Sequence, residues 1–352
     1  MSVKSEHDFK LTPTRLKVLL SMLESVGYDD TNVSRMHGIK ASTYSVVKGT
    51  LKERGLVKVE LVPSPLFFDR KILVARELRI RPLESDEALT HALLRISAEV
   101  KGITTLIASH RKIFSIEQHR NMADAQDSIE TYRNNLGDLD AGQINETLFI
   151  SDLTSRNCIW AEGYKQTALH LTGSNPVHDL QPEQFNFGAE AEDDGERERY
   201  KEFLISHIAE PEISDRALAE RMKVSRETVS RLRREILQRK VAKTMGFLAP
   251  EALGGNTLSV SVYPVTRRLD EGKITRMFRT GALCFAASNG EKVLTLSYHT
   301  TIEGAEQKIS SVLCDSELRD VLGVDVHNSI YPVSMAPFLM RHLYWRVLET
   351  GD

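Results

Sequence analysis

The sequence predicts an α+β fold in which two winged helix-turn-helix domains are each followed by a βαββαβ domain. Two observations carry this prediction. Residues 198–243 read as an apolar helix, a short helix, a tight break and a basic amphipathic helix, and residues 12–58 repeat that pattern. After each copy, the spacing of the apolar residues is that expected for a strand, a helix, two strands, a helix and a strand, in this order.

The bulk composition is that of a soluble globular protein. The chain has 352 residues, of which 41% are hydrophobic and 27% charged, and its net charge is −3. The overall charge therefore predicts no nucleic-acid partner, so such a partner has to be argued from local clusters. The three cysteines form no CxxC pair, and no run of residues is apolar enough to span a membrane. We expect a cytoplasmic location and no membrane partner.

The first helix-turn-helix is predicted within residues 1–64. Pro13 marks a helix start, because the backbone N–H that proline lacks would have no hydrogen-bond partner within the helix at the first helical position. In the second helix of the motif, Tyr44, Val47 and Leu51 form the inward stripe. Its outer side is less basic than that of the later copy, so a purely structural role is an alternative to DNA binding. The predicted DNA-contacting residues of this copy are Lys40, Ser42, Thr43, Ser45 and Lys48.

The segment after this motif, residues 65–155, reads as the first βαββαβ domain. Its first helix, at residues 84–100, has Leu89, Leu93 and Ile96 on one side. Its second helix is expected to end at Gly137, a common C-cap residue. This order of elements is the ferredoxin-like arrangement.

A connector with an acidic stretch is predicted over residues 156–197. The run GAEAEDDGERE is typical of a solvated linker, and an acidic segment that shields a basic DNA-binding face is the alternative.

The stretch KVSRETVSRLRREILQRK, residues 223–240, is the strongest functional signal in the chain. It belongs to a second winged helix-turn-helix predicted over 198–250. Ser225 suits the N-cap of its recognition helix, and Val229 and Leu232 recur on one apolar stripe with Ile236. From this cap to the start of the wing there are seven basic and two acidic residues. The residues after the helix, VAKTMGF, are predicted to form the strand and turn of a wing.

The outer face of this helix is predicted to enter the major groove of DNA. Arginine can donate two parallel hydrogen bonds to a guanine edge or a phosphate, while serine and threonine can form hydrogen bonds with either bases or phosphates. We expect Arg226 and Arg231 to read bases and Arg234 and Arg239 to contact phosphates. A solvated basic face is the alternative interpretation. The predicted DNA-contacting residues of this copy are Arg226, Thr228, Ser230, Arg231, Arg234 and Arg239.

The last part of the chain repeats the βαββαβ pattern over residues 251–337. Leu258, Val260 and Val262 alternate with polar residues, which indicates a sheet with one buried face. Asn289-Gly290 is a favoured two-residue hairpin turn. Residues 338–352 are predicted to form a C-terminal helix.

This organisation resembles the leucine-responsive, or Lrp/AsnC, family of transcription regulators, here in tandem-duplicated form. The resemblance is carried by VSRETVSRLRREI, the wing-like VAKTMGF and the strand NTLSVSVYPV that opens the second βαββαβ domain. It implies a sequence-specific transcription regulator that binds double-stranded DNA. It also implies a homodimer whose sheets stack face to face, with a small effector often bound between subunits. Many such regulators are archaeal, and an archaeal source would fit. The turn Ser288-Asn289-Gly290 is the one candidate for effector binding, although a plain hairpin turn is the better interpretation.

The sequence gives no direct sign of catalysis. HExxH, GxSxG, P-loop and GxGxxG motifs are absent. His110, His119 and His299 lie near expected sheet ends, but single histidines in such places are more often surface or core residues. We therefore predict a protein that is not an enzyme and that has no cofactor and no metal site. Two alternatives stay open. One is a tetrapyrrole-type enzyme on the same scaffold, with a sheet-lined active site and vestigial helix-turn-helix motifs. The other is a protein-interaction scaffold.

Overall fold

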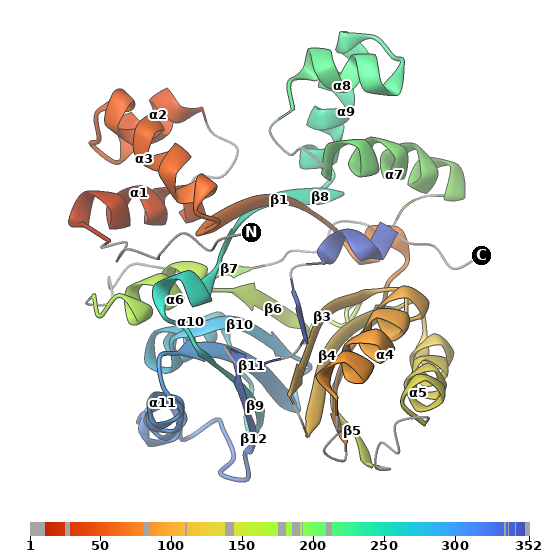
Figure 1. Cartoon of the computed structure of the whole chain (residues 1–352), viewed down its shortest axis with the longest axis vertical. Helices are drawn as coiled ribbons and strands as arrows, with labels where there is room; N and C mark the ends of the chain where they lie inside the picture. Colours follow the sequence, from red (N-terminus) through yellow and green to blue (C-terminus); the bar gives the residue numbers. More distant parts are fainter. Residues whose placement is uncertain are drawn as a thin grey trace.

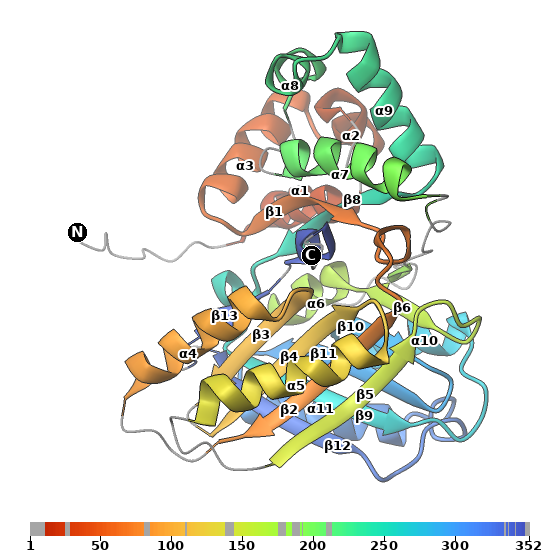
Figure 2. The same ribbon diagram turned by 90° about the vertical axis from the view of Figure 1, so that its right-hand side faces the viewer.

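The fold is known from a computed structural model of the chain (Figure 1). It describes residues 11–24, 29–80, 85–109, 111–137, 144–174, 181–184, 191, 193–208, 213–333, 336, 338–341 and 343–348. Winged helix-turn-helix elements occupy one end of the molecule, and two larger sheets with their helices occupy the other (Figures 1 and 2).

The first helix-turn-helix consists of α1 (Pro13–Glu24), α2 (Asp30–Met36) and α3 (Ala41–Glu53). The predicted start at Pro13 is confirmed. Asp29 caps α2 by accepting hydrogen bonds from two backbone N–H groups of its first turn. The inward side chains of α3 pack as expected, with Tyr44 and Leu51 buried and Val47 half-buried.

The second helix-turn-helix consists of α7 (Asp194–Ile208), α8 (Asp215–Met222) and α9 (Arg226–Gln238). Ser225 is the N-cap of α9, as predicted, and its hydroxyl accepts a 3.1 Å hydrogen bond from the backbone N–H of Thr228. The predicted apolar stripe is also confirmed, because Val229, Leu232 and Ile236 are all buried.

The wing strands of the two motifs pair with each other. Strand β1 (Val57–Pro63) runs antiparallel to β8 (Ala242–Leu248) in a two-stranded sheet. Each strand also reaches the opposite motif, since Leu61 lies in the apolar core of the second motif and Gly246 packs on α1. A Cβ at Gly246 would come within 2.9 Å of the Met22 carbonyl oxygen, so this close approach requires glycine. The expected wing at VAKTMGF is therefore a strand shared between the two motifs (Figure 1).

The first large sheet follows the predicted order of elements. These are β2 (Ile72–Arg79), α4 (Asp86–Glu99), β3 (Ile103–Ser109), β4 (Lys112–His119), α5 (Met122–Gly137) and β5 (Ile144–Asp152). Helix α5 ends at Gly137 as expected. Within the described residues, the strand order is β13-β3-β4-β2-β5.

The edge strand of this sheet corrects the prediction of a C-terminal helix over 338–352. Residues 338–340 form β13 (Phe338–Met340), which pairs with β3, and the helix described after it is a short 3₁₀ helix, η4 (Tyr344–Leu348). A strand forms here because the edge of β3 offers unpaired backbone groups that a helix could not satisfy.

The second large sheet takes two of its strands from the predicted connector. Its βαββαβ elements are β9 (Thr257–Pro264), α10 (Glu271–Gly281), β10 (Leu283–Ser288), β11 (Lys292–His299), α11 (Ile302–Cys314) and β12 (His327–Pro332). The strand order among the described residues is β12-β9-β11-β10-β6-β7.

Residues 156–197 are thus more than a linker. They contribute β6 (Ile159–Glu162), α6 (Tyr164–Leu171) and β7 (Glu183–Gln184), and β6 pairs with β10. Residues 185–190 and 192 of the acidic stretch lie outside the described residues, while α7 begins at Asp194.

The two sheets pack face to face within one chain, with helices on their outer sides (Figures 1 and 2). Apolar residues of both inner faces, such as Phe114 and Val260, belong to one core that also includes α1. The order of helices and strands is the same in both halves. That a tandem duplication produced it, and that the chain divides at the predicted domain boundaries, stay predictions.

None of the helices in the described part of the chain is sufficiently long and apolar to traverse a bilayer.

Candidate functional site

Helix α9 carries the predicted DNA-contacting residues of the second motif. Arg226, Arg231 and Arg234 are exposed, and their side chains lie along the outer side of the helix. Thr228 is half-buried and its hydroxyl lies 3.1 Å from that of Ser225.

Two other predicted contacts of α9 are directed at the protein itself. The Ser230 hydroxyl donates to Asp215 Oδ2 over 2.5 Å, which ties α9 to α8. The guanidinium of Arg239 pairs with Glu196 of α7 and lies over the rings of Phe67 and Tyr200. These two side chains hold the helix-turn-helix together, a role that helical spacing alone does not reveal.

The predicted residues of α3 divide in a similar way. Lys40, Ser42 and Ser45 are exposed, whereas Thr43 is half-buried. Lys48 donates to Asp30 Oδ1 over 2.7 Å and so joins α3 to α2. Whether either recognition helix binds DNA stays a prediction.

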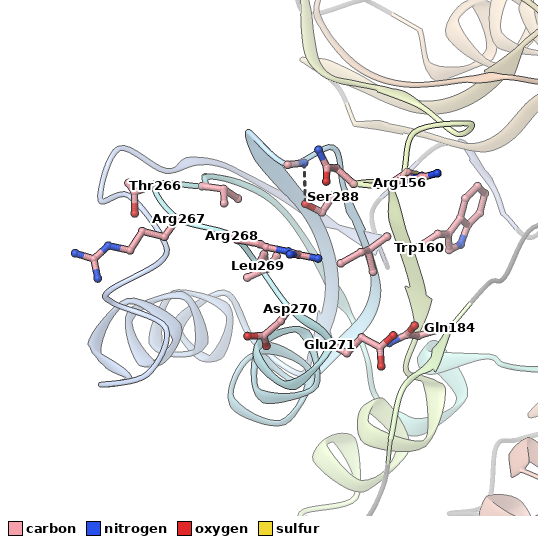
Figure 3. Close-up of a pocket in the computed structure, with 15 residues that line it drawn as sticks. Arg156, Trp160, Gln184, Thr266, Arg267, Arg268, Leu269, Asp270, Glu271 and Ser288 are labelled. Carbon is pink, nitrogen blue, oxygen red and sulfur yellow. Dashed lines mark hydrogen bonds between the residues drawn. The ribbon is translucent and has the colours of Figure 1, made fainter.

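A cavity of about 690 Å³ lies at one end of the second large sheet (Figure 3). The start of β6 and the tip of the β10–β11 hairpin form one side, and residues 265–270 before α10, with Glu271 at the start of that helix, form the other. Its polar lining comes mainly from Arg156, Arg267, Arg268, Asp270, Glu271, Gln184 and Ser288, and its apolar lining from Ile159, Val265 and Leu269.

Three arginines line this cavity. Arg268 points across it toward β6, while Arg267 and Arg156 lie toward opposite sides of it (Figure 3). All three are exposed. Two carboxylates also line the cavity, but Asp270 caps α10 and accepts from both the backbone N–H and the Nζ of Lys273 at 2.9 Å. The hydrogen bond from the Lys273 side chain lowers the pKa of Asp270. The cavity therefore presents a surplus of positive charge.

The hairpin turn that the sequence singled out borders this cavity. The amide oxygen of Asn289 accepts from the backbone N–H groups of Glu291 and Lys292 at 2.9 and 2.8 Å, so the segment is a hairpin turn. Ser288 and Gly290 nevertheless line the cavity, and Gly290 has a φ of 92°. The arginine pair at 267–268 was missed at the sequence level. Two adjacent arginines directly before the cap of a helix were the available signal.

The strand that forms the cavity wall also carries a buried acid on its other face. Trp160 lies on the far side of β6 from Arg268 (Figure 3). Glu162 follows Trp160 by two residues in β6 and therefore lies on the same face of the strand. It accepts a hydrogen bond from the Tyr344 hydroxyl over 2.7 Å, whereas its Oε2 has no hydrogen-bond partner among the described residues. Burial raises the pKa of Glu162 to about 8.

The histidines named as catalytic alternatives are core groups where the structure describes them. His119 Nε2 lies 2.8 Å from Glu117 Oε2, inside a network with Arg76, Ser128 and Tyr132. His299 is fully buried against the ring of His170, and burial lowers its pKa to about 3. His110 lies outside the described residues. Within the part of the chain that is described, no three His, Cys, Asp or Glu side chains are arranged to hold a metal ion.

Comparisons with known proteins place the fold. No protein-family model matches the chain, and no curated protein matches it in sequence. Two solved structures of the siroheme decarboxylase NirDL are similar over 95% of this chain. The first has 9% identity, a TM-score of 0.50 and 98% coverage of its own chain. The second, a co-complex with an iron-uroporphyrin III analogue, has 11% identity, a TM-score of 0.52 and 95% coverage. AsnC of E. coli matches only 42% of this chain, with 17% identity and a TM-score of 0.33.

The fold is therefore α+β and Lrp/AsnC-like. The expectation that the chain is not an enzyme is overturned, because the structures that match it along nearly its whole length are those of an enzyme. That expectation rested on the two helix-turn-helix motifs and on absent sequence motifs. Neither excludes catalysis, since the scaffold of an enzyme accommodates both motifs.

Proposed function

We propose that this protein is an enzyme that binds an iron tetrapyrrole with several carboxylate groups and removes carboxylate from it as CO₂. The observation that carries the proposal is the similarity to a siroheme decarboxylase along 95% of the chain, including both winged motifs and both large sheets. The regulators match less than half of the chain. Among the readings that the sequence left open, the tetrapyrrole enzyme has the most support.

The arginine-lined cavity supports the same conclusion from its chemistry. Its volume of about 690 Å³ lies within the range of small-molecule sites. Guanidinium groups bind carboxylates through paired N–H donors. With Arg268 in the middle and Arg156 and Arg267 on opposite sides, the cavity suits a wide ligand that carries carboxylates on its periphery. Ile159 and Leu269 supply apolar surface for a flat macrocycle.

In the proposed reaction, the bond between a side-chain carbon and its carboxylate breaks, CO₂ leaves, and a proton takes its place on that carbon. The arginines hold the carboxylates that do not react and so orient the ring. They are solvent-exposed, so we expect solvent to reach the site and supply the proton.

Ligand binding and turnover can be measured separately. Purified protein is titrated with siroheme while the absorbance of the tetrapyrrole is recorded, and the product is then analysed by mass spectrometry for the loss of CO₂. We expect a saturable spectral change and a decarboxylated product. A wild-type protein that produced neither would refute the proposal.

The role of the cavity is tested with single substitutions. Arg268→Met should weaken binding about fivefold, since it removes a solvent-exposed charged hydrogen bond worth roughly 1 kcal/mol. Arg95→Met, an exposed arginine on α4, is the matched control and should leave the affinity unchanged. Equal effects of the two substitutions would place the ligand elsewhere.

A second candidate function is nucleic-acid binding by α9. It is favoured by the exposed Arg226, Arg231 and Arg234 along one 13-residue helix. Phosphate contacts release counterions, so affinity for duplex DNA should fall steeply as salt rises. The double variant Arg226→Ala, Arg231→Ala should reduce both the affinity and its salt dependence, whereas Arg216→Ala on α8 should not. Unchanged binding in the double variant would remove this candidate.

The predicted homodimer belongs with these proposals. Sheet-on-sheet packing already occurs within one chain, so dimerisation would require another surface. Light scattering at micromolar concentration distinguishes a monomer from a dimer.

A further inference from the structure

A group of polar side chains lies at the edge of the contact between the two large sheets, away from the cavity. We call it the seam site. It consists of Glu77 and Arg79 from β2, Lys112 from β4, and His327, Ser329 and Tyr331 from β12. The site therefore takes residues from both halves of the chain.

The seam site contains a buried carboxylate oxygen without a hydrogen-bond donor. Glu77 is 1% exposed, and its Oε2 accepts from the Tyr331 hydroxyl over 2.7 Å. Its Oε1 has no hydrogen-bond partner among the described residues. The nearest basic nitrogen atoms of the described residues, Arg79 Nε and His327 Nε2, each lie 3.9 Å away, which is too far for a hydrogen bond. An unpaired buried acceptor is costly, and a ligand with a donor group would satisfy it.

The same site contains two cationic side chains but a single nearby carboxylate, that of Glu77, which lies 3.9 Å from Arg79 Nε. Arg79 and Lys112 are directly opposite each other in the β2–β4 register, and like charges at such positions repel. Lys112 is half-buried, and its Nζ donates to the Ser329 hydroxyl over 3.2 Å and lies 5.2 Å from the Tyr331 ring centre. No carboxylate of the described residues pairs with it. The two cations facing each other across the strands favour an anion between them.

Both observations point to one kind of ligand. We propose that the seam site binds a small anion that also carries a hydroxyl group, the hydroxyl donating to Glu77 Oε1 and the anionic oxygens accepting from Lys112 and Arg79. His327, which is 26% exposed and 3.5 Å from the Ser329 hydroxyl, provides a further N–H at the entrance. Dihydrogen phosphate and small hydroxycarboxylates have this chemistry. The site is separate from the arginine-lined cavity and does not depend on the enzyme proposal.

The test compares anions with and without a hydroxyl donor, and both members of the glycolate–acetate pair carry a single negative charge. Isothermal titration calorimetry on the full chain, without tetrapyrrole, measures binding of phosphate against sulfate at mildly acidic pH, and of glycolate against acetate. An acceptor left unpaired costs about 1–3 kcal/mol, so the anion with a hydroxyl should bind at least about fivefold more tightly. Preference within the first pair identifies a phosphate-type ligand, and preference within the second identifies a hydroxycarboxylate. Equal affinities in both pairs, or no binding in either, would overturn the proposal.

Substitutions locate the bound anion. Glu77→Gln should abolish the preference, because an amide can donate to sulfate as well as accept from phosphate. Lys112→Met should weaken binding of both anions of the preferred pair at least about fivefold. Lys101→Met, which removes another lysine of the same half, is the matched control and should bind as the wild type does. Retained selectivity in Glu77→Gln, or wild-type affinity in Lys112→Met, would place the anion elsewhere. If Glu77→Gln does not fold, the wild-type comparison and Lys112→Met still decide the question.

Discussion

Two glutamates, Glu117 in the first large sheet and Glu162 in the second, are equally buried but differ in their ionisation. The pKa of Glu117 is lowered to about 2, whereas that of Glu162 is raised to about 8. Burial acts on both in the same direction, since it disfavours the charged form. The difference lies in the partners of each carboxylate.

Glu117 has cationic partners and Glu162 has only neutral ones. Burial would raise the pKa of Glu117, but the hydrogen bond with His119 and the charge of Arg76 outweigh it. The hydroxyls of Ser115 and Tyr132 add 2.6 and 2.9 Å hydrogen bonds. Glu162 is contacted by phenol and indole groups, which donate hydrogen bonds without supplying charge. Depth of burial therefore does not decide the ionisation of a carboxylate, because the charge of its neighbours can reverse the effect.

The largest expected effect is a loss of stability caused by Glu162 as the pH rises from about 4.5 to 8. Its folded pKa of about 8 exceeds the ordinary glutamate value of 4.5, so its contribution is fully present below pH 4.5 and is lost as pH rises toward 8. The loss is at most about 5 kcal/mol, at roughly 1.4 kcal/mol for each pKa unit. Urea unfolding between pH 5 and 8 measures it. Glu162→Gln should show a flatter dependence than the wild type, and parallel curves would contradict a neutral Glu162.

Removal of the other carboxylate should lower stability by a similar amount. Glu117→Ala leaves the buried guanidinium of Arg76 without its counter-charge, which costs about 3–5 kcal/mol. Urea unfolding at neutral pH measures the change in the free energy of unfolding. Glu130→Ala on α5, whose side chain is well exposed, is the control and should change it by less than about 1 kcal/mol. A loss below 1 kcal/mol in Glu117→Ala would mean that Glu117 is not a buried charge partner.

A smaller effect is expected on the acid side. Because the pKa of Glu117 is lowered from 4.5 to about 2, its contribution is present above pH 4.5 and is lost as pH falls toward 2. The loss is at most about 3.5 kcal/mol. Acid unfolding followed by circular dichroism should show a shallower dependence in Glu117→Gln than in the wild type. An identical acid transition in both proteins would contradict the assignment.

The smallest effect comes from a matched pair of tyrosines. Tyr132 donates to Glu117 and Tyr344 donates to Glu162, over 2.9 and 2.7 Å. Tyr132→Phe should cost about 1.5–3 kcal/mol because its acceptor is charged, and Tyr344→Phe about 1 kcal/mol because its acceptor is neutral at pH 7. Unfolding at pH 7 and again at pH 9 sharpens the comparison, since the cost of Tyr344→Phe should rise once Glu162 ionises. If Tyr132→Phe and Tyr344→Phe cost the same free energy of unfolding as each other at pH 7 and again at pH 9, Glu117 and Glu162 would have the same charge state.

Most of the local structure could be predicted from the amino-acid sequence. Helix starts at Pro13 and Ser225, the apolar stripe of Val229, Leu232 and Ile236, and the hairpin at Asn289 all follow from interactions between residues close in the chain. Such contacts have nearly the same geometry in any protein, so a pattern of residues predicts them.

The features that join distant segments could not be predicted from the sequence, because they depend on the folded arrangement of the whole chain. The pairing of β1 with β8, the strand rather than helix at residues 338–340, and the incorporation of β6 into the second large sheet depend on which edges meet in space. The cavity and the seam site arise in the same way, since their residues are far apart in the sequence. The charge states of Glu117 and Glu162 also belong here, because neighbours from other elements set the pKa of a buried group.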